Sequence, residues 1–118
     1  MSGSLRISGA HHAQEHRDDE RLDAAAGILA LLADRTRLAL LQRLSAGEAD
    51  VTTLTEATGA PRTSVSQHLG KLRLAGLVTT RKDGRRVVYA LRHGHLRRLV
   101  DEALSVADHQ IGGLPPHD

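Results

Sequence analysis

The sequence has no cysteine, no phenylalanine and no tryptophan, and Tyr89 is its one aromatic residue. Without cysteine the chain can form neither disulfides nor thiolate metal sites, and it has no cysteine nucleophile. Because large aromatic side chains are missing, Leu, Val, Ile and Ala must build the core, which favours helices packed on helices. No apolar run approaches the roughly 20 residues of a membrane helix, and the first residues lack the apolar stretch of a secretory signal. We therefore expect a cytoplasmic protein with one domain and tails.

Basic residues are concentrated in one segment, although the formal net charge of the 118-residue chain is only +2. Residues 62–98 contain ten Lys or Arg and one acid, so this segment has a net charge of +9. Residues 1–61 have a net charge of −3, and residues 99–118 have four acids and no basic residue. A basic segment between acidic ones is typical of proteins that bind the phosphate backbone of nucleic acid. The alternative is a solvated cationic face.

Helical periodicity and capping residues predict four helices before residue 77. Residues 1–20, which include three histidines, are expected to form a flexible N-terminal arm. Asp34 and Asp50 are good N-caps for the second and third helices. Pro61 fits the first turn of the fourth helix, which we expect Gly76 to end. The predicted helices cover residues 21–33, 35–45, 51–58 and 61–75.

The pattern then changes to that of β-strands. Residues 77–82 and 85–91 are β-branched runs joined by Asp83-Gly84, which is a strong signal for a hairpin. A fifth helix follows, from about His93 or His95 to His109, and residues 110–118 are expected to form a non-helical C-terminal tail. The predicted fold is mainly α with a two-stranded β-hairpin, in the order ααααββα.

The short turn between the third and fourth helices, followed by a basic hairpin, is typical of a winged helix-turn-helix. In that fold the fourth helix lies in the major groove of double-stranded DNA, and the hairpin contacts phosphates or enters the minor groove. The alternative for any one of these residues is an ordinary polar surface. The candidate DNA-binding residues are Arg62, Thr63, Ser64, Ser66, Gln67, His68 and Lys71 on the fourth helix, with Arg81, Lys82, Arg85 and Arg86 on the hairpin.

Three segments resemble the ArsR/SmtB family: residues 32–38 (LADRTRL), 64–73 (SVSQHLGKLR) and 83–89 (DGRRVVY). The resemblance implies a homodimeric winged-helix regulator of transcription that dimerises through its first and last helices and binds operator DNA. It assigns residues 21–109 to one DNA-binding and dimerisation domain. Many members release their operator when they bind a metal ion, and usually they are repressors.

Eight histidines are present, and the spacing of two of them bears on metal binding. His95 and His109 are 14 positions apart, so they lie on nearly the same face of a helix but about 21 Å apart along its axis. One ion cannot join them within a chain. If two final helices pack antiparallel across a two-fold axis, His95 of one lies opposite His109 of the other, with Asp108 adjacent. A symmetric dimer then has two equivalent sites.

The resemblance also implies which residues of the last helix bind metal. The zinc-type site of the family would use positions 93, 95, 106 and 109, and Val106 cannot be a ligand. The region instead resembles the nickel- and cobalt-sensing branch, whose ligands match His95, Asp108, His109, His117 and, with Asp in place of the usual His, Asp118. We therefore predict a metal site drawn from His93, His95, Asp108, His109 and His117.

Imidazole and carboxylate donors without sulfur suit Ni(II) or Co(II), and Zn(II) also binds them. His11, His12 and His16 either complete the shell or are incidental polar residues of the arm. The thiolate site that arsenic and cadmium sensors carry in the third helix is absent, because residues 48–52 contain no sulfur.

These observations predict a dimeric, metal-responsive DNA-binding regulator. One alternative is a regulator of the same fold that responds through a partner protein. Another is a small nickel-binding storage or delivery protein, which would need neither Gln67 nor the basic hairpin. An enzyme is not expected, since no Ser-His-Asp or paired-carboxylate arrangement stands out. The operator, the regulated genes and the sign of regulation are left open.

Overall fold

The structure is a computed structural model that describes the backbone of residues 2–113 and the side chains of residues 12–113. His117, Asp118 and the side chain of His11 lie outside the described residues. The chain divides into two compact units, Met1–Ala33 and Asp34–Asp118. Each unit is described separately below.

The first unit is one helix, α1 (Ser2–Leu32). The predicted helix start near residue 21 is therefore wrong, and residues 2–20 are helical. Charged and polar side chains at helical spacing support this polar part: His16 Nε2 lies 3.0 Å from Glu20 Oε1, and Gln14 donates a hydrogen bond to Asp18. Pairs at i, i+3 and i, i+4 stabilise a helix without requiring an apolar face, and for this reason the hydrophobic pattern did not reveal it.

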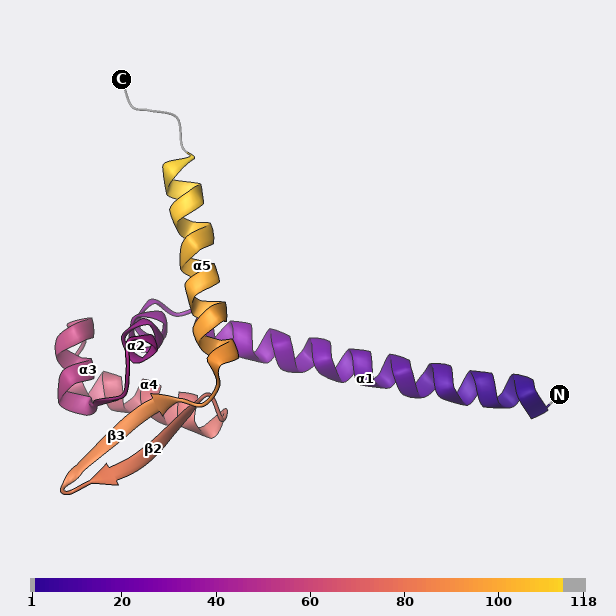
Figure 1. Cartoon of the computed structure of the whole chain (residues 1–118), viewed down its shortest axis with the longest axis horizontal. Coiled ribbons are helices and arrows are strands. Elements are labelled where there is room, and N and C mark those ends of the chain that lie inside the picture. The colour runs from indigo at the N-terminus through magenta and orange to yellow at the C-terminus, as the bar shows by residue number, and fades with distance from the viewer. Residues whose placement is uncertain (1, 114–118) are drawn as a thin grey trace. The chain divides into compact units, whose positions relative to one another are not determined.

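The second unit holds four helices and a small sheet (Figure 1). In chain order these are α2 (Arg35–Ser45), β1 (Ala49–Asp50), α3 (Val51–Thr58), α4 (Arg62–Leu74), β2 (Val78–Asp83), β3 (Arg86–Leu91) and α5 (Gly94–Gly112). The predicted bounds of α2 and α3 are confirmed, and so are their N-caps: Asp34 accepts a hydrogen bond from Arg37 N, and Asp50 accepts one from Thr53 N. The winged helix-turn-helix prediction is confirmed by this order of elements.

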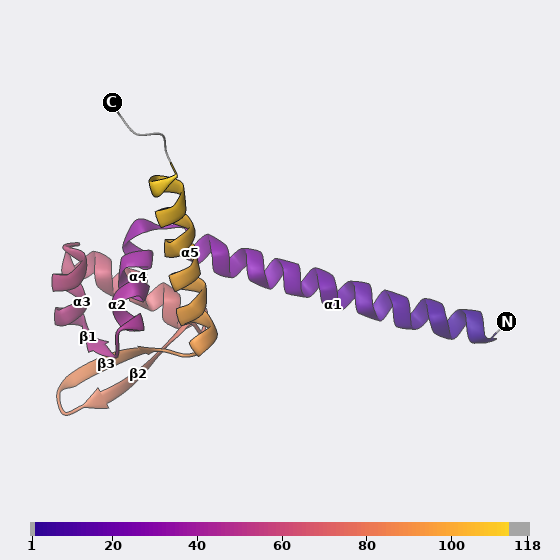
Figure 2. The same ribbon diagram turned by 45° about the horizontal axis from the view of Figure 1, so that its top comes forward.

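The sheet has three antiparallel strands in the order β1-β3-β2, rather than the two strands predicted (Figure 2). Asp50 is extended because it caps α3, and its backbone pairs with Val88 of β3. A two-residue strand carries no periodicity, so the sequence pattern could not predict it. The hairpin turn also differs from the prediction. Asp83 pairs with Arg86, so the two turn residues are Gly84 and Arg85, and Gly84 has the positive φ (64°) that a tight hairpin turn needs.

Helix α5 continues past the predicted end at His109, and Gly112, expected in a non-helical tail, is its last residue. Gly113 closes the helix, since its N–H donates to the His109 carbonyl at 2.7 Å. A Cβ at position 113 would lie 2.9 Å from that same oxygen, so this turn requires glycine.

The core lies where α2 packs against α3, α4 and α5. It is aliphatic, as the scarcity of aromatic residues predicts, and no polar side chain is buried among the described residues. Val65, Leu69 and Leu72 fix one side of α4 in this core. The fully buried side chains are Leu40, Leu41, Leu44, Leu54, Leu69, Leu72, Val65, Val78 and Val100.

Two leucines on α4 provide a matched test of this core. Leu72 is 0% exposed and Leu74 is 92% exposed. We predict that Leu72→Ala lowers the free energy of unfolding by about 3 kcal/mol, because it removes buried methyl groups and leaves a cavity. Leu74→Ala should change it by less than about 0.5 kcal/mol. Urea denaturation followed by circular dichroism measures both, and equal losses would contradict the packing described here.

Candidate nucleic-acid interface and metal-ligand positions

Helix α4 presents a polar face opposite its buried side. Thr63, Ser66, Gln67 and Lys71 are exposed, whereas Ser64 is half-buried. Gly70 lies between them and adds no side chain to this surface. The structure thus brings most of the predicted α4 residues together on one outward surface that can reach the edges of bases.

His68 points away from this surface, toward the start of α2. Its side chain is 18% exposed, with Nδ1 3.1 Å from Arg37 Nη1 and Nε2 4.0 Å from Asp34 Oδ1. A guanidinium only donates hydrogen bonds, so we assign Nδ1 as the acceptor and place the ring proton on Nε2, facing the Asp34 carboxylate. The backbone hydrogen bond from Arg37 holds the pKa of Asp34 below its ordinary value, with a smaller contribution from the Arg37 charge. His68 therefore joins α4 to the first turn of α2.

The start of α4 is also joined to α3. Arg62 Nη1 donates a hydrogen bond to Thr52 Oγ1 at 3.2 Å. Pro61 occupies the N-cap of α4 and provides no side-chain cap, so this contact is the described link between the two helix starts. With His68, it fixes the outward face of α4 relative to α2 and α3.

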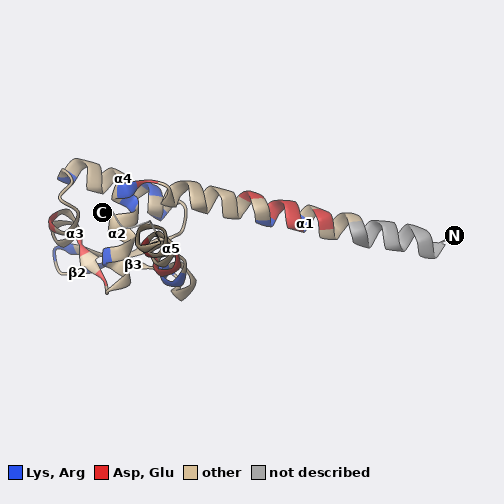
Figure 3. Cartoon of the chain, turned by 90° about the horizontal axis from the view of Figure 1, so that it is seen from above, with Lys and Arg blue, Asp and Glu red and all other residues tan. Residues whose placement is uncertain are grey.

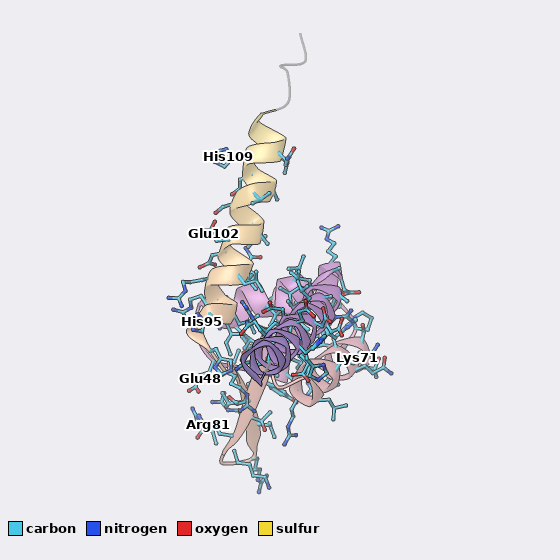
Figure 4. All side chains as sticks on the ribbon, turned by 90° about the vertical axis from the view of Figure 1, so that its right-hand side faces the viewer. Glu48, Lys71, Arg81, His95, Glu102 and His109 are labelled. Atoms are coloured by element: carbon cyan, nitrogen blue, oxygen red, sulfur yellow. The ribbon has the colours of Figure 1, made fainter. Side chains whose placement is uncertain are left out.

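Two of the four predicted wing cations are bound by acidic residues. Arg81 donates two hydrogen bonds to the Glu48 carboxylate, one of them from Nε at 3.1 Å. Arg86 donates to Asp50 at 3.3 Å and to Asp83 at 3.2 Å. Figure 4 shows Glu48 and Arg81 close together beside the hairpin. The +9 charge of residues 62–98 is therefore partly neutralised by acids that come from residues 48–50.

These contacts lower the pKa values of the two acids, as pairing with a cation predicts. The hydrogen bond from Arg81 is the main cause that lowers the pKa of Glu48, and the same contact raises the pKa of Arg81. The pKa of Asp50 is lowered chiefly by hydrogen bonds from Thr53, with a smaller contribution from the Arg86 charge. Asp50 thus caps α3 and binds the wing with one carboxylate.

Figure 3 colours the basic residues of the winged unit blue, and seven of them belong to α4 and the hairpin; α1 carries more acidic than basic residues. Lys82 and Arg85 are exposed, and within residues 12–113 neither side chain makes a hydrogen bond or an ion pair. They are the wing cations that remain available to a polyanion.

The predicted metal ligands of α5 do not meet within one chain. His95 and His109 lie on the same side of the helix, with Glu102 midway between them (Figure 4). Asp108 and His109, together with Gly112 and Gly113, line an open hollow of about 410 Å³. His93 is the N-cap residue of α5 and lies by a different hollow with Arg97. Among the described residues of one chain, no three His, Asp or Glu come together as a metal group.

His95, Leu99, Glu102, Val106 and His109 form a stripe along α5 with alternating spacings of four and three residues. This is the spacing of a helix that packs along another helix. Leu99 is 36% exposed and Val106 is 57% exposed, although both are apolar. We call these five residues the α5 stripe. Glu102 was not among the residues singled out from the sequence, although its seven-residue spacing from each histidine places it on the same stripe.

Comparison with known proteins agrees with this geometry. Residues 32–81 match a family model described as a helix-turn-helix domain. The chain is 42% identical over 99 residues to the transcriptional regulator KmtR of Mycobacterium tuberculosis, which covers 84% of this chain and 76% of that protein. It is 35% identical over 108 residues to the regulator NmtR of the same organism, covering 92% and 90%. The chain belongs to the ArsR/SmtB family of winged helix-turn-helix transcriptional regulators.

Solved structures of family members have the same fold. The homodimeric winged helix-turn-helix DNA-binding domain of Mb0332 from Mycobacterium bovis matches with a TM-score of 0.74 and 32% identity, over 86% of this chain and 94% of that one. The repressor BigR of Xylella fastidiosa matches with a TM-score of 0.70 and 29% identity, over 78% and 94%. As in the family, the chain is a regulator and not an enzyme, which confirms that prediction. No described helix is long and apolar enough to cross a bilayer.

The Asp50 carboxylate gives a testable pH dependence. Its pKa is lowered in the folded protein, so its stabilising contribution is complete above the ordinary Asp pKa and is lost as pH falls through the folded value. Asn also caps helices well, so Asp50→Asn removes the charge and keeps the cap. We predict that the variant loses less stability than the wild type between about pH 5 and pH 2, measured by urea denaturation. Superimposable pH profiles would contradict this assignment.

Proposed function

We propose that this ArsR/SmtB regulator is a homodimer that binds operator DNA and releases it when a divalent metal, Ni(II) or Co(II) in preference to Zn(II), binds between its two α5 helices. The observation that carries the proposal is the α5 stripe, which has a histidine at each end and the exposed apolar residues Leu99 and Val106 between them. The proposed ligands are His95 of one subunit with Asp108 and His109 of the partner subunit.

The DNA half of the proposal rests on α4. Gln67 can make a bidentate pair with adenine, and Thr63 and Ser66 can hydrogen-bond to several bases. All three are exposed on the same face, with Lys71 placed for a backbone phosphate. Because His68 is held by α2, we assign it a positioning role rather than a base contact.

The dimer half rests on the symmetry of the α5 stripe about Glu102. In an antiparallel pair centred there, His95 lies opposite His109 of the partner subunit, and Leu99 lies beside Val106 of the partner subunit. The two apolar residues, exposed in a single chain, would then be covered. Leu22 and Leu29 of α1 are also exposed apolar residues.

The donor set fits a divalent ion of intermediate hardness. Imidazole nitrogens and a carboxylate oxygen, with no sulfur, suit Ni(II) and Co(II), which accept more than four ligands. Asp108 and His109 lie in the last turns of α5, where the negative end of the helix dipole favours a cation. The glycines beside them leave space for further donors. His93, His117 and the N-terminal histidines are candidates for those positions.

When bound, the ion supplies a positive charge that links the two subunits. Helix α2 packs against both α5 and α4. A change in the position of α5 therefore moves α2 and α4 with it as one rigid body. DNA affinity and metal affinity are reciprocally linked, and coupling in such systems is about 5- to 150-fold.

We predict that His95→Ala and His109→Ala keep DNA affinity without metal within about twofold and abolish its loss upon metal addition, whereas the wild type loses at least about fivefold. The measurement is fluorescence anisotropy of duplex DNA from upstream of the gene, titrated with Ni(II), Co(II) and Zn(II) at fixed salt.

Gln110→Ala, an exposed residue of α5 outside the proposed ligand set, is the matched control and should respond like the wild type. A wild-type dimer that binds metal tightly with unchanged DNA affinity would overturn the metal-release proposal and favour regulation through a partner protein. Metal binding without any DNA binding would favour a storage or delivery role.

A second prediction concerns Arg98, whose Nη2 lies 2.6 Å from His95 Nδ1. A neutral imidazole has one free lone pair, and the contact with Arg98 uses it, so Arg98 competes with the metal. We predict that Arg98→Ala tightens Ni(II) binding about two- to fivefold, as expected for removing an exposed charge. Arg97→Ala is the control, and isothermal titration calorimetry measures both. Equal effects of the two variants would show that His95 is not the ligand affected.

A further inference from the structure

The strand register places the wing charges in two groups. Residues directly opposite one another in a sheet share a face, and successive residues of a strand alternate faces. Arg81 and Asp50 both lie opposite Val88, and Asp83 lies opposite Arg86. Arg81, Arg86, Asp50 and Asp83 therefore lie on one face of the sheet, while Lys82 lies on the other.

On that face, every arginine has an acidic partner. Arg81 reaches across β3 to Glu48, the residue directly before β1. Arg86 is held between Asp50 and Asp83 at 3.3 and 3.2 Å. Three carboxylates thus surround two guanidinium groups, and no net positive charge is left on this side of the wing. Lys82 and Arg85 have no such partner among residues 12–113.

We propose that Glu48 and Asp50 are positioning residues that retain Arg81 and Arg86 within the protein, so that only Lys82 and Arg85 of the wing neutralise DNA phosphates. The proposal rests on the operator binding proposed above. It adds that two of the wing cations have a positioning role within the protein and that the other two contact DNA. Asp50 also caps α3, so the same acid that holds Arg86 connects the wing to the helix-turn-helix. The wing is thereby fixed at a set angle to α4.

The test is the salt dependence of DNA binding without metal. The slope of log K against log salt is negative, and each phosphate contact that is lost reduces its magnitude by about 0.9. We expect Lys82→Gln and Arg85→Gln each to reduce the magnitude of the slope by about that amount for each wing that contacts DNA. Arg81→Gln and Arg86→Gln should leave the slope unchanged. These four variants are matched, because each removes one cation from the same hairpin.

A further variant separates positioning from mere structural support. Glu48→Gln frees the Arg81 guanidinium, so the slope should become steeper than in the wild type, by up to about 0.9 per wing. Combined with Arg81→Gln, the same substitution should have no effect on the slope. A purely structural role of Glu48 would not produce this dependence on Arg81.

The assignment is overturned if Arg81→Gln reduces the magnitude of the slope as much as Lys82→Gln does, or if Glu48→Gln leaves the slope unchanged. Failure of the proposed function would look different, since wild-type protein would then show no binding to the duplex at any salt concentration. Circular dichroism of each variant confirms that the fold is retained before slopes are compared.

Discussion

The separation of His95 from His109 on one continuous helix is the constraint on which the rest of the proposed function depends. A helix cannot shorten, and about 21 Å separates the two ends of the α5 stripe, whereas metal–ligand bonds are about 2 Å long. Neither end is a complete site by itself, because no three potential ligands come together among the described residues of one chain. In the proposed dimer, a second copy of α5 in antiparallel orientation would supply what each end lacks. The proposal therefore links metal binding to dimerisation.

The second requirement is that α4 follows any change at α5, and the packing around α2 meets it. Buried leucines of α4 pack against α2, and His68 binds both Arg37 and Asp34 at the start of α2. Helix α2 also packs against α5. Because aliphatic cores are close-packed and resist gradual deformation, the proposed response requires the winged unit to shift as a body rather than bend between α5 and α4. The ion pairs of Arg81 and Arg86 with acidic residues also hold the hairpin in place. These two arginines are therefore not free to contact DNA in the proposed complex.

Local signals in the sequence predicted the helix-turn-helix well, and long-range pairing defeated the prediction elsewhere. Asp34 and Asp50 mark helix starts by capping within a few residues, so α2 and α3 were placed correctly. Strand β1 depends on pairing with residues about 40 positions away, and the polar part of α1 has no apolar period. The partners of Arg81 and Arg86 could not be predicted for the same reason, since Glu48 lies 33 positions from Arg81. The metal ligands remain a prediction, because their site requires two chains.

Subunit mixing tests the central claim, that each metal site is shared between two chains. In a dimer of one His95→Ala subunit and one His109→Ala subunit, one site loses both histidines and the other retains both. Neither variant alone should bind Ni(II) tightly, as measured by equilibrium dialysis. An equilibrated one-to-one mixture, in which about half the dimers are mixed, should bind about half an ion per dimer. If the mixture binds no more than the separate variants, His95 and His109 do not act across the interface, and the shared site is refuted.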